Sequence, residues 1–256
     1  MIDPRAVVDP GAEIAEGVEV GPFAVIGPGV RIGAGSWIGP HAVVKGPTVL
    51  GRDTRVFQFA SIGDAPQDRK YAGEPTRLVV GDRNVFREFC SINRGTAGGR
   101  AVTRIADDCL FMAYSHVAHD CIVGSHCIMS NCTALAGHVE LGDWVILSGY
   151  AGVHQFTKIG AHAFLANNAA VTRDVPPYLL VAGSPAEPKG INSEGLKRRG
   201  FDAAQIANIK NAYRILYRSG LKLAEAMEQL RALAASQPEL APFVDFLGAS
   251  ERSIIR

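Results

Sequence analysis

The sequence is poor in cysteine, has almost no net charge and lacks long hydrophobic runs. Its five cysteines are an odd number without the two-residue spacing of metal ligands, which argues against a disulfide framework and is typical of a reducing compartment. No stretch approaches the roughly 18 apolar residues of a membrane-spanning helix, and the N-terminus has no signal region. A net charge of +1 provides no overall field for nucleic acid. We therefore expect a cytoplasmic protein with no integral membrane segment and no nucleic-acid partner.

Glycine and proline become scarce near the C-terminus: only four of 28 glycines and two of 14 prolines lie beyond residue 190. Because Gly costs a helix interior about 1 kcal/mol and Pro about 3 kcal/mol relative to Ala, residues 1–190 are not mainly helical. Beyond them, apolar residues recur at helical spacing, Asp202 is a plausible N-cap and Gly220 a stop. These features predict a small α-helical domain at 191–256. Its expected helices are 203–218, a second from Leu223 to Ala234, and a shorter one through Phe243, Phe246 and Leu247.

Residues 1–190 carry an aliphatic or other large apolar residue at every sixth position. The series begins at Val8 and breaks after Ile62, resumes at Val80, breaks again, and runs from Ile105 to Val171. A second slot, four residues after each of these, holds Ala, Val, Ser, Thr or Cys, with Asn84 as the exception. A period of six fits neither a helix nor simple alternation, so each hexad must be a short strand followed by a corner.

Stacking is the only arrangement that buries one apolar side chain from every hexad. Three hexads per turn give a triangular coil, so we predict an all-β parallel β-helix over 1–190. The two breaks in the repeat predict inserted loops near 63–79 and 95–104, and the polar, turn-rich first insertion is a candidate substrate-binding loop.

Four of the cysteines occupy the small slot, and Cys132 lies one place before it. A small, weakly polar side chain suits a buried slot, so we interpret these cysteines as packing residues and expect no covalent acyl-enzyme. The four are Cys90, Cys109, Cys121 and Cys127.

Four histidines share one edge of the predicted prism when the chain is numbered in coils of eighteen. They come from three successive coils, about 4.8 Å apart along the axis. Imidazoles grouped in this way suit general-base catalysis near neutral pH or metal ligation, although histidine can also simply occupy an exposed corner. The group consists of His116, His119, His138 and His154, and the histidines that illustrate the exposed-corner alternative are His41, His126 and His162.

Zinc requires three converging ligands, which His116, His119 and His138 could approximate. A zinc site, however, explains neither the two inserted loops nor the basic run at 197–199. We therefore expect no metal. That basic run is itself ambiguous, because three adjacent cations are often only a solvated surface.

Six segments, spread in order over the whole chain, resemble motifs of a known enzyme family. These segments are 67–76, 113–120, 135–139, 153–156, 174–178 and 192–201. They are similar to those of the hexapeptide-repeat acyltransferases that move an (R)-3-hydroxyacyl group from acyl carrier protein to the 3-hydroxyl of UDP-N-acetylglucosamine, the first step of lipid A biosynthesis. The resemblance implies a left-handed coil, a homotrimer with sites between prisms, no cofactor, and UDP-N-acetylglucosamine and (R)-3-hydroxyacyl acyl carrier protein as partners.

The resemblance also implies residue roles. His119 would be the general base, oriented by Asp120, and the N–H of Gly137 would meet the oxyanion, while His138 and His116 would position the reacting groups. Asn167 aligns with a position that limits acyl-chain length, which implies a preference for medium-length chains. The other implied substrate-binding residues are Gln67, Asp68, Lys70, His154, Gln155, Asn192, Glu194, Arg198 and Arg199.

Other functions remain open on the sequence alone. The hexapeptide class includes zinc carbonic anhydrases and purely structural scaffolds, and a sister enzyme N-acylates UDP-3-acyl-glucosamine. That sister enzyme carries a separate domain before its hexads, whereas here the repeat begins at Val8. Asn93 and Ser184 depart from the residues common in the family, and neither is assigned a role.

Overall fold

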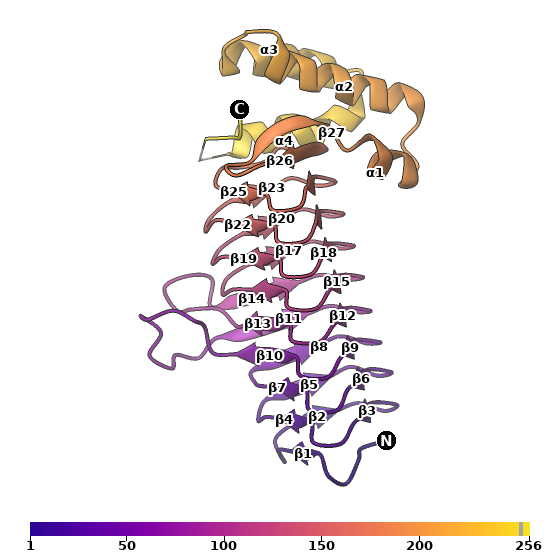
Figure 1. The fold of residues 1–256 in the computed structure, drawn as a ribbon, viewed down its shortest axis with the longest axis vertical. Coiled ribbons are helices and arrows are strands. Elements are labelled where there is room, and N and C mark those ends of the chain that lie inside the picture. Colours follow the sequence, from indigo (N-terminus) through magenta and orange to yellow (C-terminus); the bar gives the residue numbers. More distant parts are fainter. Residues whose placement is uncertain (251–252) are drawn as a thin grey trace.

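The computed structural model describes residues 1–250 and 253–256. Over this part of the chain, short strands wind into a three-sided prism that rises from the N-terminus, and helices lie at its C-terminal end (Figure 1). Each side of the prism is a sheet of parallel strands, apart from one antiparallel strand at the top. The parallel β-helix expected from the six-residue period, followed by a helical region, is thus confirmed.

The chain visits the three sheets in turn, one strand on each per coil. Sheet 1 contains β1 (Val7–Val8), β4 (Val25–Ile26), β7 (Val43–Val44), β10 (Ser61–Asp64), β13 (Ser91–Asn93), β16 (His116–Val117), β19 (Ala134–Leu135), β22 (Gly152–Val153) and β25 (Ala170–Val171). Sheet 2 contains β2 (Glu13–Ile14), β5 (Val30–Ile32), β8 (Thr48–Leu50), β11 (Arg77–Val80), β14 (Val102–Ile105), β17 (Ile122–Val123), β20 (Glu140–Leu141) and β23 (Lys158–Ile159). Sheet 3 contains β3 (Glu19–Val20), β6 (Trp37–Ile38), β9 (Arg55–Val56), β12 (Val85–Phe86), β15 (Leu110–Phe111), β18 (Ile128–Met129), β21 (Ile146–Leu147), β24 (Phe164–Leu165), β26 (Leu179–Ala182) and the antiparallel β27 (Glu187–Ile191).

The strand register places each inward side chain over its equivalent in the next coil. In sheet 1, Val8 pairs with Ile26, Ile26 with Val44, and Val44 with Ile62. Apart from those of the first coil, these inward residues are nearly fully buried, whereas the preceding residue of each short strand faces outward. The six-residue period is therefore the period of core packing.

The prism has three edges, which we number by the sheets they join. The first edge lies between sheets 1 and 2, the second between sheets 2 and 3, and the third between sheets 3 and 1. The chain leaves the coil twice, between β10 and β11 and between β13 and β14, and both excursions project from the first edge (Figure 1). We call residues 65–76 the first loop and residues 94–101 the second loop.

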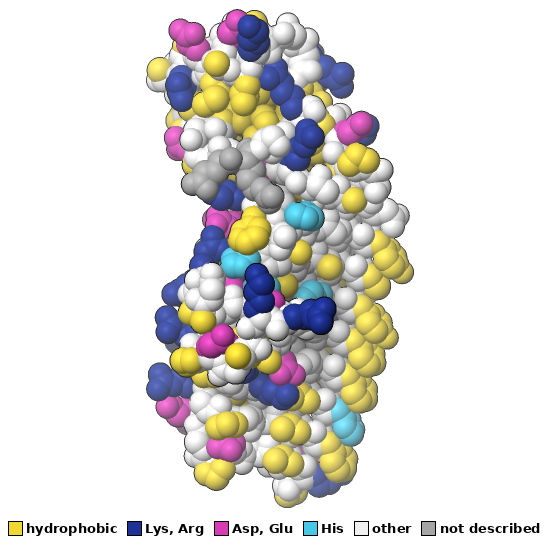
Figure 2. Space-filling view, turned by 90° about the vertical axis from the view of Figure 1, so that its left-hand side faces the viewer, with side chains coloured by type: hydrophobic (Ala, Val, Ile, Leu, Met, Phe, Trp, Pro, Cys, Tyr) yellow, Lys and Arg dark blue, Asp and Glu magenta, His cyan; other side chains and the backbone are white. Residues whose placement is uncertain are grey.

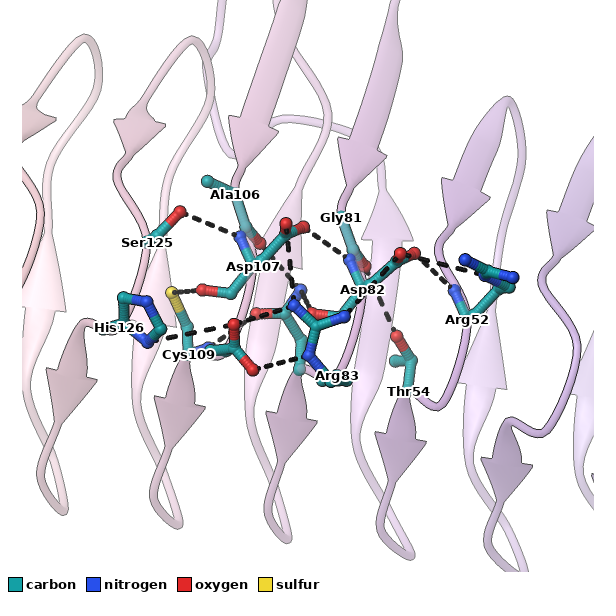
Figure 3. A network of polar contacts seen from close by, with 12 residues as sticks. Arg52, Thr54, Gly81, Asp82, Arg83, Ala106, Asp107, Cys109, Ser125 and His126 are labelled. Atoms are coloured by element: carbon teal, nitrogen blue, oxygen red, sulfur yellow. Dashed lines mark hydrogen bonds and ion pairs between the residues drawn. The ribbon is translucent and has the colours of Figure 1, made fainter.

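Aspartates tie successive coils together along the second edge (Figure 3). The Asp82 carboxylate accepts a hydrogen bond from the Arg52 backbone N–H at 2.7 Å, and the Asp107 carboxylate accepts one from the Asp82 N–H at 2.7 Å. Arg83 adds a paired contact to Asp108 at 2.7 and 2.8 Å. The hydrogen bonds to the Asp82 and Asp107 carboxylates satisfy backbone N–H groups at the corners, where the strand-to-strand hydrogen bonds do not reach.

Asn84, the exception in the small slot, has a structural reason. Its amide nitrogen donates to the carbonyls of Ala106 at 2.8 Å and Asp82 at 3.2 Å, and its carbonyl accepts from the Cys109 N–H at 2.9 Å. The side chain is fully buried. Asn84 therefore bridges two coils directly after the first loop.

The cysteines are packing residues, as expected. The four slot cysteines are buried and Cys132 is half-buried. The Cys121 thiol contacts the Ala136 carbonyl at 3.2 Å, and burial raises the pKa of Cys121 to about 12. Such a thiol carries no thiolate near neutral pH.

Helices cover the end of the prism. They are α1 (Ser193–Arg198), α2 (Ala203–Arg218), α3 (Leu223–Ala234), the 3₁₀ helix η1 (Pro238–Leu240) and α4 (Ala241–Ala249). The expected N-cap Asp202 is confirmed by a capping box with Gln205. One hydrophobic core runs from the prism into these helices, and Tyr178 donates to the Glu239 carbonyl at 2.9 Å. Within the described part of the chain, no helix has the length and apolar character needed to cross a bilayer.

Replacing Asn84 with Ala is expected to destabilise the prism by roughly 2–4 kcal/mol, because buried backbone groups of Ala106 and Cys109 lose their partners. Thermal or urea unfolding measures this change. Thr54→Ala is the control, since Thr54 fills the same slot one coil below and its hydroxyl makes one long 3.5 Å contact. Equal unfolding midpoints for Asn84→Ala and the wild type would contradict the bridging role.

Candidate active site at the first edge

Two neighbouring cavities contain the four histidines of the predicted group. His119 and His138 line a cavity of about 700 Å³ beneath the first and second loops. His116 and His154 line a second cavity of about 530 Å³ on the outer face of sheet 1. Figure 2 shows histidine side chains beside Lys and Arg side chains on the face that carries the loops. The four histidines thus lie along one edge, but two of them line the larger cavity and two line the smaller one.

His119 and Asp120 form a directly hydrogen-bonded pair. The Nδ1 atom of His119 lies 2.9 Å from Oδ2 of Asp120. The Asp120 side chain is fully buried, whereas His119 is 16% exposed toward the cavity. Because the carboxylate can only accept, Nδ1 donates to it and Nε2 is left as the acceptor.

The second loop wraps around the Asp120 carboxylate. Oδ2 accepts the Thr96 N–H at 3.0 Å and the Thr96 hydroxyl at 2.6 Å, and Oδ1 accepts the Arg100 N–H at 2.8 Å. The Arg100 guanidinium also donates to the Asp120 carbonyl at 2.8 Å. On the prism side, the Asp120 N–H donates to the Thr103 hydroxyl at 2.9 Å. The second loop therefore builds the surroundings of this carboxylate.

These donors decide the charge of Asp120. Burial opposes its ionisation, but the hydrogen bonds from Thr96, His119 and Arg100 outweigh burial and hold the pKa of Asp120 below its ordinary value. Asp120 is therefore a carboxylate near neutral pH, and it can stabilise an imidazolium at His119.

His138 lies beside this pair one coil higher. Its ring is 5.2 Å from that of His119, edge to face, and stacks on Phe156 at 4.3 Å. Its Nε2 is 3.8 Å from Oδ2 of Asp120. Burial lowers the pKa of His138 although the Asp120 charge opposes this, so its imidazole is neutral near pH 7.

Gly137 lies against the His119 imidazole. A β-carbon at this position would lie 2.6 Å from Cε1 and 2.7 Å from Nε2 of His119, so any side chain would displace the ring. Among the described residues, no hydrogen-bond partner is found for the Gly137 N–H. The absence of a side chain at Gly137 therefore leaves room for the His119 ring beside this backbone.

The first loop supplies the opposite wall of the larger cavity. Gln67, Asp68 and Lys70 line it, and the Asp68 carboxylate accepts the Lys70 N–H at 3.0 Å. Arg94 anchors the loop by donating to the Gly63 carbonyl at 3.0 Å and the Tyr71 hydroxyl at 3.2 Å. Gln155 also lines this cavity.

Four expected site residues lie elsewhere in the single chain. Asn192, Glu194, Arg198 and Arg199 belong to α1 and its two ends, at the top of the second edge. Asn192 caps α1 through the Gly195 N–H at 3.1 Å and donates to the His162 carbonyl at 2.9 Å. Within one chain, the structure does not bring these residues to the cavity of His119.

Arg199 is docked on the second edge. Its Nη1 donates to Nδ1 of His162 at 3.2 Å, and its guanidinium lies 5.1 Å from the ring centre of Trp144. Burial, together with the Arg199 charge, lowers the pKa of His162 to about 4, so His162 stays a neutral acceptor. His162 therefore occupies a corner, as that alternative has it, but it is only partly exposed because Arg199 and Phe201 contact its ring.

Asn167 is exposed at the third edge and does not line either cavity. The adjacent Asn168, with φ of 58°, lines the smaller one. His116, from β16, is held there by a 2.7 Å hydrogen bond to the Ser91 hydroxyl, and burial lowers the pKa of His116.

The donor set does not fit a metal centre. Potential ligand atoms of His119, Asp120 and His138 lie within 4.8 Å of one another. Oδ2 of Asp120, however, already accepts three hydrogen bonds, one of them from Nδ1 of His119, and Oδ1 accepts a fourth. His116, the third ligand considered from the sequence, faces the other cavity.

Sequence reasoning missed the residues that surround Asp120. Thr96, Arg100 and Thr103 lie in or beside the second loop, and Phe156 stacks on His138. The only sequence signal for the first three is the interruption of the repeat before Ile105. That signal locates a loop, but not the direction of its side chains.

Comparison with known proteins agrees with this geometry. Residues 103–137 match the profile of bacterial transferase hexapeptide repeats, and residues 174–255 match domain 2 of UDP-N-acetylglucosamine O-acyltransferase. The coil and its cavities at one edge thus define a hexapeptide-repeat transferase.

Full-length relatives refine this class. The chain is 52% identical to the acyl-[acyl-carrier-protein]–UDP-N-acetylglucosamine O-acyltransferase of Stutzerimonas stutzeri strain A1501, over 100% of this chain and 99% of that protein. The enzyme of the same name from Stenotrophomonas maltophilia strain R551-3 is 55% identical, over 100% and 97%. The crystal structure of Francisella novicida UDP-N-acetylglucosamine acyltransferase superposes with a TM-score of 0.98 at 44% identity, covering 100% of this chain and 94% of that one. The chain belongs to the acyl-[acyl-carrier-protein]–UDP-N-acetylglucosamine O-acyltransferase family.

Proposed function

We propose that this protein transfers an (R)-3-hydroxyacyl group from acyl carrier protein to the 3-hydroxyl of UDP-N-acetylglucosamine, at the start of lipid A biosynthesis. The observation that carries the proposal is the His119–Asp120 pair, whose imidazole lines a cavity of about 700 Å³. Family membership supplies the substrates, and the pair supplies the chemistry.

The reaction needs a base because a sugar hydroxyl is a poor nucleophile while it holds its proton. Nε2 of His119 takes that proton as the hydroxyl oxygen attacks the thioester carbonyl carbon. Asp120 stabilises the resulting imidazolium through Nδ1. The carbon–sulfur bond then breaks, the thiol leaves with the proton from His119, and the ester remains on the sugar.

The attacked carbonyl oxygen becomes negative between these steps. By family resemblance the N–H of Gly137, whose backbone lies against the His119 ring, would donate to that oxygen. His138, neutral near pH 7, and His116 would position the sugar and the acyl group, while Asp68 and Lys70 contact substrate from the first loop. No enzyme nucleophile is required, which agrees with the burial of the slot cysteines.

The outer faces of the prism support a homotrimer. On sheet 3 the outward side chains are apolar from the middle coils upward, on sheet 1 many are small, and on sheet 2 many are charged. The apolar set is Val85, Leu110, Ile128, Ile146 and Phe164; the small set is Ser61, Ser91, Ala134, Gly152 and Ala170; the charged set is Glu13, Arg31, Arg104, Glu140 and Lys158. A ring of three copies packs sheet 3 of one against sheet 1 of the next and leaves sheet 2 in solvent.

The third edge would then face the three-fold axis. It carries a stacked ladder of exposed rings with centroids 4.8–5.3 Å apart, formed by Phe23, His41, Phe59, Phe89 and Tyr114. In the same ring, the second edge of one copy meets the first edge of its neighbour. Arg199 and Asn192 of one chain would thereby reach the His119 cavity of another, where they and His154, Gln155, Glu194 and Arg198 would hold the nucleotide sugar.

The smaller cavity suits an acyl tail. It is a trough over Ala134, Gly152 and Ala170, next to His116, and Asn168 lines it at the corner where Asn167 is the adjacent residue. Small outward side chains leave room for an alkyl chain between two prisms. A polar corner at its end would limit the chain length.

The direct test incubates purified protein with 3-hydroxyacyl carrier protein and UDP-N-acetylglucosamine and detects acylated nucleotide sugar by mass spectrometry. The expected product carries one ester at the sugar 3-hydroxyl. An ester at another hydroxyl, hydrolysis of the thioester without transfer, or no reaction with chains of about 8 to 16 carbons, the range offered, would overturn the proposal.

His119→Ala is expected to lower kcat by roughly 10² to 10⁴, because it removes the general base. Stability and UDP-sugar binding should change little, since the side chain borders the cavity and contributes little to the core. Asp120→Asn should lose less activity, because it keeps the base. Calorimetric binding and a thermal melt accompany the rate measurement, and retention of more than about a tenth of the activity would exclude His119 as the base.

Arg199→Ala is expected to raise the KM for the nucleotide sugar or the carrier protein more than it lowers kcat, because an anchoring charge binds ground and transition states alike. Lys197→Ala is the matched control, since Lys197 is exposed and pairs with Glu194 at 2.9 Å. Steady-state kinetics at two salt concentrations measure both variants. Unchanged KM values and salt dependence would leave Arg199 as an anchor of α1 alone.

Asn167→Gly is expected to shift the preference from medium toward longer 3-hydroxyacyl chains. Each methylene that can be buried is worth about 0.8 kcal/mol, so four excluded methylenes correspond to roughly a hundredfold in kcat/KM. Carrier-bound chains of several lengths compete in one reaction. Asn168→Gly is the paired variant, because its positive φ tolerates glycine. A shift in that variant alone would place the stop at Asn168.

A further inference from the structure

We propose that Thr96 is a positioning residue that tunes the basicity of His119 through Asp120. The inference rests on the proposed function only in calling His119 the base. Thr96 belongs to the second loop, is 7% exposed, and contacts the carboxylate through two atoms. Neither the family motifs nor the repeat assign it a role.

The geometry places three donors on one oxygen, two from Thr96 and one from His119, and the two shortest of these contacts bear on the argument. Oδ2 of Asp120 accepts the Thr96 hydroxyl at 2.6 Å and Nδ1 of His119 at 2.9 Å. A hydrogen bond to a carboxylate oxygen withdraws part of its negative charge. The hydrogen bond from the Thr96 hydroxyl therefore reduces the negative charge on Oδ2 that would otherwise stabilise the imidazolium of His119.

Removing the Thr96 hydroxyl should change the pKa of His119 in one direction only. Without it, Oδ2 interacts more strongly with Nδ1–H of His119 and stabilises the protonated ring, so the pKa of His119 rises. The base is then protonated at a higher pH, and the acid limb of the activity profile moves to higher pH. A residue that only anchored the second loop would lower activity equally at all pH values.

The other charges around the pair stay in place. Arg100 donates to the Asp120 carbonyl and pairs with Glu140, and Nε2 of His138 lies 3.8 Å from Oδ2 of Asp120. His116 lies on β16, in the same coil as His119. Asp68 and Lys70 of the first loop border the same cavity. Because none of these groups changes in a Thr96 variant, their effects cancel between the variant and the wild type.

Thr96→Val removes the hydroxyl and keeps the branched shape and the backbone N–H that also donates to Oδ2 at 3.0 Å. Thr96→Ser restores the hydroxyl and should restore the wild-type behaviour. Thr133→Val is the matched control: Thr133 is fully buried and its hydroxyl donates to the Ser130 carbonyl at 2.8 Å, away from Asp120. Thr96→Ala makes the same chemical change with a smaller side chain and replaces Thr96→Val if that variant does not fold.

The first measurement does not depend on turnover. Diethyl pyrocarbonate modifies unprotonated imidazole, and peptide mass spectrometry follows the rate at His119 against pH. We expect the midpoint of Thr96→Val to move up by about 0.5 to 1 pH unit, and that of Thr96→Ser and Thr133→Val to stay at the wild-type value. In the Asp120→Asn background, Thr96→Val should cause no further shift, because the shared charge is gone.

The second measurement is the pH profile of kcat/KM, whose acid limb should move by the same amount. A wild-type midpoint in Thr96→Val, or an equal shift in the Asp120→Asn background, would overturn the inference. If wild-type protein forms no acylated sugar, the proposed function fails, but the modification midpoints still decide the role of Thr96.

Discussion

The structure depends on the repeated stacking of one inward apolar residue per hexad. Each short strand buries little by itself and forms few hydrogen bonds, so no coil is stable alone. The register that places Val44 over Ile26 and beneath Ile62 makes the core continuous along the axis. At the upper end, helices α2 to α4 share this core. A prism built in this way is rigid, and its edges are repeated at a fixed spacing.

That rigidity explains how the candidate site is organised. Asp120 and His138 occupy equivalent corner positions in successive coils, with φ of 60° and 64°. The second loop covers the Asp120 carboxylate, which is fully buried, whereas His119 faces the cavity. A buried carboxylate stays ionised only if donors compensate for lost water. The second loop provides those donors, so an insertion in the repeat is what keeps a buried carboxylate ionised at this edge.

The three faces of the prism differ in the character of their outward side chains. Sheet 2 presents charged side chains, sheet 3 apolar ones and sheet 1 small ones. One chain therefore places the His119 cavity on its first edge and Arg199 on its second. Under the proposed trimer, both halves of the site come together between neighbouring prisms. The docking of Arg199 on neutral His162 would then fix α1 as part of a neighbour's site.

The sequence by itself determined the coil, because a period of six in apolar residues admits no other way to bury them. It also located α2 with its N-cap Asp202, α3 and α4, but not the short α1. Counting alone brought His116, His119, His138 and His154 to one edge. Side-chain direction at irregular loops has no period to count, so only the tertiary structure showed Thr96 and Arg100 around Asp120. It also decided that these histidines line two cavities and that Arg199 contacts His162. A repeat can be recognised in the sequence because each repeat unit packs in the same way as the next. Contacts across loops and between distant coils have no such period, so they depend on where the folded chain places each side chain.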